Sequence, residues 1–217
     1  RKIGQRKAPS GRYTLVVDSR CVRQLLNPMV NALYGPALHQ QNSFLLDRLG
    51  KQVGSSRFTL LDEPHLIGAN GARYFDGEGV ATRPMTVFDA GTLRTYYIDT
   101  YCARKMEVEP TIASPSLLVL APGAQTQEEL IAEVTHGLFV TGFNGGNCNS
   151  STGDFSYGIE GFLIENGQLT QPVNEMVVTG NMIDLWQHLA AVGNDARMES
   201  NWRIPTLTFE GVTASGC

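Results

Sequence analysis

The fold of this chain is decided by the stretch Ile159-Glu160-Gly161-Phe162-Leu163-Ile164-Glu165-Asn166-Gly167-Gln168-Leu169-Thr170-Gln171-Pro172-Val173. An apolar run over residues 159–164 is followed by Asn166-Gly167, and a second run then reaches Val173. Asn-Gly is the typical dipeptide of a two-residue hairpin turn, because both turn positions need positive φ angles. The stretch therefore predicts two antiparallel strands joined by a tight turn.

Further short strands are predicted on both sides of this hairpin. Their common feature is a compact run of apolar, β-branched or aromatic residues bounded by polar or glycine-containing segments. The predicted strands cover residues 13–17, 58–61, 116–120 and 206–209, and a second hairpin joins residues 86–88 to 92–98. Residues 68–79 are rich in glycine and predict a long ordered loop.

Three helices are predicted where apolar residues recur three and four positions apart, over residues 22–33, 128–138 and 182–192. Ser19 is the expected cap of the first. Pro28 lies inside that first pattern and lacks the N–H that a continuous helix uses. Two outcomes stay open: a kink, or a second helix that begins at Pro28 with Asn27 as its cap.

Together these elements predict an α+β fold, with mixed, largely antiparallel sheets, hairpins and a few packed amphipathic helices. Strands and helices do not alternate steadily, as they do in a doubly wound parallel sheet. The chain has 217 residues, of which 42% are hydrophobic, so it can form a sizeable core.

Charge and termini narrow the classes of function. There are 17 Lys and Arg against 21 Asp and Glu, a net charge of −4, which is unlike the strongly basic surface of a nucleic-acid-binding domain. No apolar run approaches the roughly 20 residues of a membrane span. Residues 1–7 are basic and polar and do not begin with Met. We therefore expect residues 1–12 to be the remnant of an interdomain linker and residues 13–217 to form one domain of a longer protein.

Cysteine and histidine spacing predicts neither a disulfide framework nor a metal clip. Cys21, Cys102, Cys148 and Cys217 are widely separated, which favours a reduced, cytoplasmic protein. The four histidines are scattered, and His136 is expected on the second predicted helix as a structural residue. No set of nucleophile, base and orienting residue is complete, so no catalytic residue, metal site or cofactor is predicted.

A glycine-rich segment over residues 142–154 is the strongest candidate for a functional loop. It contains Gly145, Gly146, Cys148, Thr152, Gly153 and Asp154. Its spacing matches neither a P-loop nor a dinucleotide fingerprint. A structural crossover with closely packed backbone is favoured over phosphate binding. Cys148 has no cationic neighbour in sequence that would lower its pKa, which argues against a catalytic thiolate.

Several motifs in the second half of the chain occur in an order that resembles the C-terminal domain of the TldD/PmbA family. They are Thr152-Gly153-Asp154-Phe155-Ser156-Tyr157-Gly158, Ile164-Glu165-Asn166-Gly167, Pro172-Val173, Gly180-Asn181 and Val192-Gly193-Asn194-Asp195. Upstream, residues 43–52 and 75–80 look like the same domain. The resemblance covers residues 13–212 and implies that an N-terminal domain precedes this one.

The resemblance also implies where a zinc site would lie. TldD-like subunits carry a His-Glu-x-x-x-His motif on the first helix of this domain and a Cys ligand near the C-terminus. PmbA-like subunits, also called TldE, lack the motif. Leu26 and Asn31 stand here at the two His positions, and Asn27 stands at the Glu position. Residues 199–203 contain no Cys. The likeness is therefore to the PmbA-like branch, with no zinc and no general base.

The resemblance to the TldD/PmbA family implies a non-catalytic PmbA/TldE-like subunit of a cytoplasmic zinc metallopeptidase complex that processes or degrades unfolded peptides. The partner would be a TldD-like zinc-bearing subunit or a second copy of this protein, with no direct contact to nucleic acid or membrane. Residues 145–154 would then shape a cleft or a subunit interface. The alternative is a protein-binding module that regulates gyrase-linked or toxin–antitoxin proteins without proteolysis. A third hypothesis is a self-contained hydrolase that uses Cys148.

Overall fold

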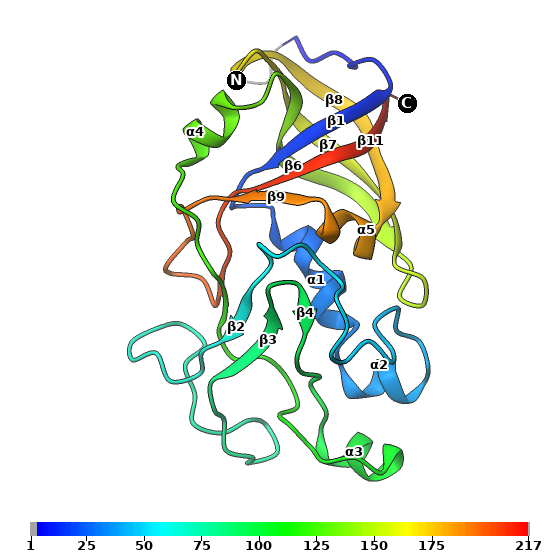
Figure 1. Cartoon of the computed structure of the whole chain (residues 1–217), viewed down its shortest axis with the longest axis vertical. Coiled ribbons are helices and arrows are strands. Elements are labelled where there is room, and N and C mark those ends of the chain that lie inside the picture. The colour runs from blue at the N-terminus through cyan, green and yellow to red at the C-terminus, as the bar shows by residue number, and fades with distance from the viewer. Residues whose placement is uncertain (1–3, 217) are drawn as a thin grey trace.

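The computed structural model describes residues 4–216 (Figure 1). Along the chain its elements are β1 (Gly11–Val17), α1 (Arg23–Asn31), α2 (Gly35–His39), β2 (Leu60–Asp62), β3 (Met85–Asp89), β4 (Thr92–Leu93), α3 (Thr100–Met106), β5 (Leu118–Leu120), α4 (Gln127–Ala132), β6 (His136–Cys148), β7 (Asp154–Glu165), β8 (Gln168–Asn181), α5 (Met182–Gln187), β9 (Leu189–Val192), β10 (Trp202–Arg203) and β11 (Leu207–Gly216). The α+β class predicted from the sequence is confirmed. Within residues 4–216, no helix is both long and apolar enough to cross a membrane.

A small barrel forms the upper half of the molecule in Figure 1. Its strands follow the order β1-β6-β7-β8-β11, and β11 pairs with β1 again to close the ring, while β9 extends the sheet beyond β11. Among the named strands of this sheet in residues 4–216, β1 and β6 run parallel and the other paired strands run antiparallel. Closure leaves the barrel strands with few free edges, which suits long strands in a domain of this size.

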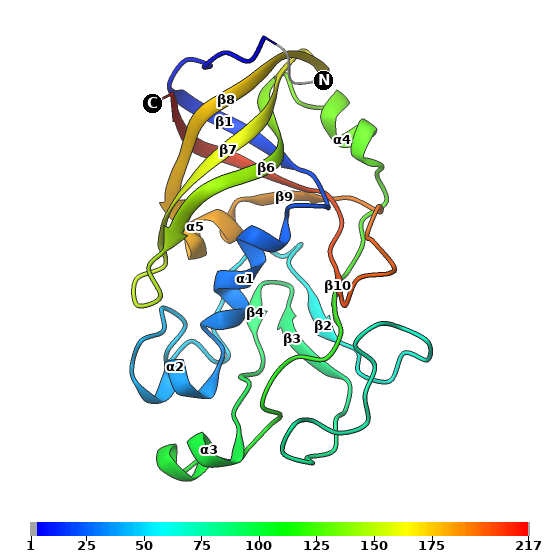
Figure 2. The same cartoon turned by 180° about the vertical axis from the view of Figure 1, so that it is seen from behind.

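A second sheet forms the lower half, with the order β10-β5-β2-β3-β4. The predicted hairpin over residues 86–98 is confirmed, although its ladder covers only Phe88–Leu93 and Asp89–Thr92. Helices α1 and α5 lie between the two halves, as Figures 1 and 2 show.

The core between the halves is built around Trp186 of α5, whose side chain is fully buried. Its ring centroid lies 4.2 Å from that of Phe58 and 5.5 Å from that of Phe209, and Phe58 in turn stacks on Phe88 at 4.5 Å. Aromatic contacts of this kind stabilise beyond their buried area. They join the barrel to the lower sheet as one packed unit.

The first predicted helix is present, and the ambiguity at Pro28 is resolved. Helix α1 is a single helix with Pro28 inside it, and Val22 is its N-cap residue without any side-chain cap, so the expected cap at Ser19 is wrong. The buried residues of α1 are those of the predicted apolar stripe, namely Leu25, Leu26, Met29 and Val30.

The other two predicted helices are too long. Helix α4 ends at Ala132, and His136 is the first residue of β6, so placing His136 on a helix was wrong. The apolar run after it is buried on both faces, because Phe139 packs under α4 while Leu138 and Val140 face the main core. Such a run does not distinguish a buried strand from a helix. The predicted helix over residues 182–192 likewise ends at Gln187 and continues as β9.

The glycine-rich segment is mostly strand, so the predicted loop over residues 142–154 is wrong for its first half. Strand β6 continues to Cys148, and only residues 149–153 turn into β7. The β6–β7 ladder shifts register between Val140 and Gly142 and again between Phe143 and Gly146. These bulges let glycine occupy a strand that would otherwise exclude it.

At the N-terminal end, β1 begins at Gly11, within residues 1–12. The Arg6 N–H also donates a hydrogen bond to the Pro172 carbonyl oxygen of β8. The assignment of residues 1–12 as a linker stays a prediction. Cys217 lies outside the described residues.

Candidate functional site

Helix α1 and the distal half of β6 border a cavity of about 370 Å³. Asn27 and Asn31 lie four residues apart and therefore share one face of α1, which lines this cavity. Cys148 lines it from the end of β6. Figure 2 shows the β6–β7 turn reaching down beside α1 and α2. The other lining residues are Pro28, Ala32, Ala37, Asn42, Phe44, Ser150 and Tyr157.

Leu26, the third position of the degenerate motif, is not brought into this cavity. Its side chain is 0% exposed and belongs to the main hydrophobic core. A step of five residues from Leu26 to Asn31 rotates them to different faces of the helix. The structure thus brings Asn27, Asn31 and Cys148 together and leaves Leu26 apart.

Beyond Val140, strand β6 has a free edge. Strand β1 pairs with β6 only from Gly137 to Val140, and the chain then turns away into α1. Within residues 4–216, no strand pairs with that edge of β6 from Thr141 to Cys148, although β7 pairs with the other edge. Unpaired N–H and C=O groups on such an edge can bond an extended chain.

A second cavity of about 430 Å³ continues along this edge toward the N-terminal end of α1. It is lined by Arg20, Cys21, Arg23, Gln24, Asn27 and Phe143. Asn27 lines both cavities, so the two adjoin at this residue beside α1 and the free edge of β6. We call this feature the α1–β6 groove.

The turn after β6 is fixed to neighbouring elements on both sides. The Ser150 hydroxyl donates to the Asn42 Oδ1 at 2.8 Å, and the Phe44 N–H donates to the Ser150 carbonyl oxygen at 2.9 Å. On the other side, the Asn181 Nδ2 donates to the Asp154 Oδ1 at 3.0 Å. Backbone and side-chain bonds to the turn therefore hold one wall of the groove in place.

Of the remaining candidates, Gly145 and Gly146 lie in β6 and do not line the cavity. Thr152, Gly153 and Asp154 contact α5 and β8. The Thr152 hydroxyl donates to the Asp154 Oδ2 at 2.7 Å, and the Met182 N–H donates to the Gly153 carbonyl oxygen at 2.8 Å. Hydrogen bonds from Asn181 and Thr152 lower the pKa of the Asp154 carboxyl. These three residues support the turn.

The Cys148 thiol is poorly suited to nucleophilic chemistry. Burial, with a smaller contribution from the Asp154 charge, raises its pKa to about 11. A catalytic cysteine instead needs a lowered pKa, because the thiolate is the nucleophile. Cys21, Cys102 and Cys148 are all free thiols.

The residues of the groove do not fit a zinc ion. Structural and catalytic zinc sites use thiolates, imidazoles and carboxylates. Asn27 and Asn31 offer only neutral amides, Leu26 is buried, and the thiol of Cys148 resists deprotonation. Within residues 4–216, no group of three or more His, Cys, Asp and Glu could hold a metal.

The chain is similar to known proteins over nearly its whole length. The family model described as the PmbA/TldA metallopeptidase C-terminal domain matches residues 10–216. The chain belongs to the TldD/PmbA family. Metalloprotease PmbA from Escherichia coli O157:H7 is 32% identical over 218 residues, which cover 100% of this chain and 47% of the relative.

Solved structures of TldD/PmbA relatives have the same fold. A Bacteroides thetaiotaomicron protein named as a proposed modulator of DNA gyrase superposes with a TM-score of 0.99 at 61% identity, covering 100% of this chain and 49% of its own. TldE from Thermococcus kodakarensis superposes with a TM-score of 0.89 at 23% identity, covering 97% of this chain and 52% of its own. That second likeness concerns the fold alone. The chain spans about half the length of the curated relatives it matches.

Most residues that line the α1–β6 groove were not predicted from the sequence. Asn42, Phe44, Tyr157, Arg20 and Arg23 come from three separate segments and carry no common spacing. Their only signal was indirect, since the stretches that resemble the family include Phe44 and Tyr157. None of the four histidines lines the α1–β6 groove. The ring of His136 packs against the ring of Tyr13, with 4.7 Å between the ring centroids.

Proposed function

We propose that this chain is the C-terminal domain of a non-catalytic PmbA/TldE-like subunit in a cytoplasmic zinc metallopeptidase complex. The α1–β6 groove would hold part of an unfolded peptide while a TldD-like subunit supplies the zinc and the general base. The observation that carries the proposal is the chemistry of α1. At the motif positions, neutral amides face the groove and a leucine faces the core, in a family whose model is that of a metallopeptidase.

The groove has features that suit an extended peptide. The free edge of β6 offers main-chain donors and acceptors, which is how sheet edges bind peptides of varied sequence. The side chains of Asn27, Asn31 and Asn42 can both donate to and accept from peptide groups. Neutral amides bind without the desolvation penalty of buried charges. These properties support recognition of main chain rather than of one particular side chain.

Metal content and activity test the first part of the proposal. We expect the purified 217-residue chain, dialysed against zinc, to retain well below one equivalent of zinc and to leave an unstructured peptide such as casein intact. Hydrolysis should begin when a subunit with the His-Glu-x-x-x-His motif is added, and chelation of that subunit's zinc should stop it. Chelator-sensitive hydrolysis by this chain alone would refute the proposal.

Site-specific cross-linking tests the groove. Asn147 lies on the exposed part of the free edge, and Gln168 is an exposed residue at the other end of the β7–β8 ladder. A photo-reactive side chain at Asn147 should capture an unfolded peptide, whereas the same group at Gln168 should not. Equal capture at both positions would rule out the groove as the binding site.

A protein-binding role without proteolysis is the second candidate, because the Bacteroides thetaiotaomicron relative is named as a proposed modulator of DNA gyrase. Affinity capture separates the two candidates. Recovery of a subunit with the zinc motif supports the peptidase complex, and recovery of gyrase subunits in its place supports the binding module.

A further inference from the structure

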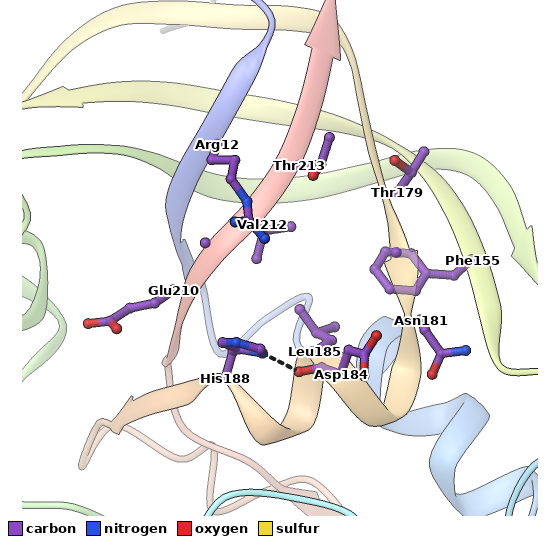
Figure 3. Close-up of a pocket in the computed structure, with 12 residues that line it drawn as sticks. Arg12, Phe155, Thr179, Asn181, Asp184, Leu185, His188, Glu210, Val212 and Thr213 are labelled. Atoms are coloured by element: carbon purple, nitrogen blue, oxygen red, sulfur yellow. Dashed lines mark hydrogen bonds between the residues drawn. The ribbon is translucent and has the colours of Figure 1, made fainter.

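A separate cavity of about 170 Å³ lies on the outside of the barrel, between α5 and strands β1, β8 and β11 (Figure 3). Its floor consists of Phe155, Leu185 and Val212, which are at most 7% exposed. Its rim carries four ionisable side chains, namely Arg12, Asp184, His188 and Glu210. None of these residues lines the α1–β6 groove.

The charges are sorted to two sides of this cavity. Arg12 pairs in register with Thr213, and Thr213 pairs with Thr179, so a guanidinium and two hydroxyls form a row across β1, β11 and β8. Asp184 and His188 come from α5 and its C-cap, and Glu210 lies beside them because its N–H donates to the His188 carbonyl oxygen at 3.1 Å. Figure 3 shows Arg12 above the floor and the α5 residues below it.

Three of the ionisable side chains at the rim have no polar partner among the described residues. Within residues 4–216, the side chains of Arg12, Asp184 and Glu210 form neither a hydrogen bond nor an ion pair, although four ion pairs are present elsewhere in these residues. His188 donates from Nδ1 to the Asp184 carbonyl oxygen at 2.7 Å, since a carbonyl can only accept, and this leaves Nε2 available.

Two backbone features keep the cavity open. Strand β11 bulges at Glu210 and Gly211, because the register with β1 jumps from Val212 to Phe209. At Gly180, an added Cβ would lie 3.2 Å from the Phe155 Cε1, so a larger residue would crowd that ring.

We propose that this cavity binds a small zwitterion with an apolar side chain, that is, a hydrophobic amino acid or a dipeptide. The ligand's carboxylate lies at Arg12 and the two threonines, its ammonium lies at Asp184, and its side chain covers Phe155, while the Glu210 side chain points away from the cavity (Figure 3). The volume equals about six water molecules of ~30 Å³ each and lies below the roughly 300–1,000 Å³ of sites for larger ligands. Under the function proposed above, such ligands are products of peptide hydrolysis. Their binding at this site would then make the activity of the peptidase complex depend on product concentration.

Titration of the ¹⁵N-labelled 217-residue chain with L-leucine tests the proposal by amide chemical shifts. We expect saturable shifts at about 10 mM or below, confined to residues around the cavity. N-acetyl-L-leucine lacks the ammonium and L-leucinamide lacks the carboxylate, and each should bind at least about tenfold more weakly, because each forfeits a charge-assisted hydrogen bond.

Variants locate the site. Arg12→Gln and Asp184→Asn should each weaken binding about tenfold, and Gly180→Ala should weaken it without removing charge. Arg83→Gln, at an exposed arginine of the loop before β3, is the matched control and should bind like the parent chain. The amide spectrum of each variant reports folding directly. Absence of saturable shifts, equal binding of the three ligands, or an equal effect of R12Q and R83Q would overturn the proposal, whatever the outcome of the zinc and peptide tests.

Discussion

Two adjacent glycines of β6, Gly145 and Gly146, allow the bulge of the β6–β7 hairpin to be tested with a matched pair of substitutions. Both have positive φ angles, +73° and +95°. A Cβ at Gly145 would meet nothing within 4 Å. A Cβ at Gly146 would overlap the Ser156 carbonyl oxygen and lie 2.8 Å from the Tyr157 Cα, and both of these atoms belong to the backbone of β7.

The expected costs differ because only one substitution forces the strands apart. Gly145→Ala carries only the strain of a left-handed alanine, about 1–2 kcal/mol, reduced by the smaller entropy of its unfolded state. Gly146→Ala carries the same strain and also separates β6 from β7, which breaks ladder hydrogen bonds worth about 1 kcal/mol each. We expect losses in the free energy of unfolding of about 1 kcal/mol for G145A and about 3 kcal/mol for G146A.

Thermal unfolding followed by circular dichroism measures both. For a chain of this size, about 1 kcal/mol lowers Tm by roughly 2–4 °C, so G145A should fall within that range and G146A should lose about 6–12 °C. Because the bulge shapes the free edge of β6, G146A should also bind unfolded peptide more weakly than G145A does. Equal Tm values for the two variants would refute the reasoning, since φ alone would then explain both.

Three more predictions concern the groove and its surroundings. Asn27→His combined with Asn31→His should create zinc binding, because the pair shares a helix face beside Cys148, and a further Cys148→Ser should weaken that binding as measured by competition with a chromogenic chelator. Cys148 in the parent chain should react with iodoacetamide at pH 7 about 100-fold more slowly than an ordinary thiol. The reason is that a pKa of about 11 in place of 9.0 lowers the thiolate fraction by that factor. A rate like that of free cysteine would contradict this prediction. Burial alone would raise the pKa of Asp18, but hydrogen bonds and charge from Arg20 outweigh burial and lower this pKa below 3.8. The Asp18–Arg20 pair therefore stabilises the folded chain above pH 3.8. This stabilisation is lost as pH falls through the lowered pKa of Asp18 in the folded state. Asp18→Asn should therefore cost about 1–2 kcal/mol at pH 7, and this cost should shrink as pH is lowered below 3.8, as measured by urea titrations. A cost independent of pH would argue against the ion pair.

The sequence was most informative where a single physical signal dominated. Asn166-Gly167 located the hairpin turn, and the apolar stripe of α1 identified every buried residue of that helix. It was least informative where one pattern fits two structures. Leu138 continues the helical spacing of α4, yet it lies in strand β6 because closing the barrel needs a partner between β1 and β7. That requirement is non-local and leaves no trace in the spacing.

Only three residues of the candidate site were predicted from the sequence, and its geometry was not. The motif positions on α1 and Cys148 were both identified from the sequence, but their meeting in one cavity depends on β6 continuing as a strand through its glycines. Glycine in a strand is disfavoured, so the local signal indicated a loop. The register shifts of the β6–β7 ladder accommodate these residues. They could not be derived without the partner strand.

The chemistry of α1 explains how this helix packs with Leu26, Asn27 and Asn31 in these positions. Leu26 adds to the apolar core on one face, while Asn27 and Asn31 keep the opposite face polar without charge. A histidine in place of Leu26 would be buried away from the groove and would need a hydrogen-bond partner there, since unpaired buried polar groups are costly. A leucine at this position therefore contributes to packing rather than to the groove, which fits the proposed role of the groove in holding a peptide.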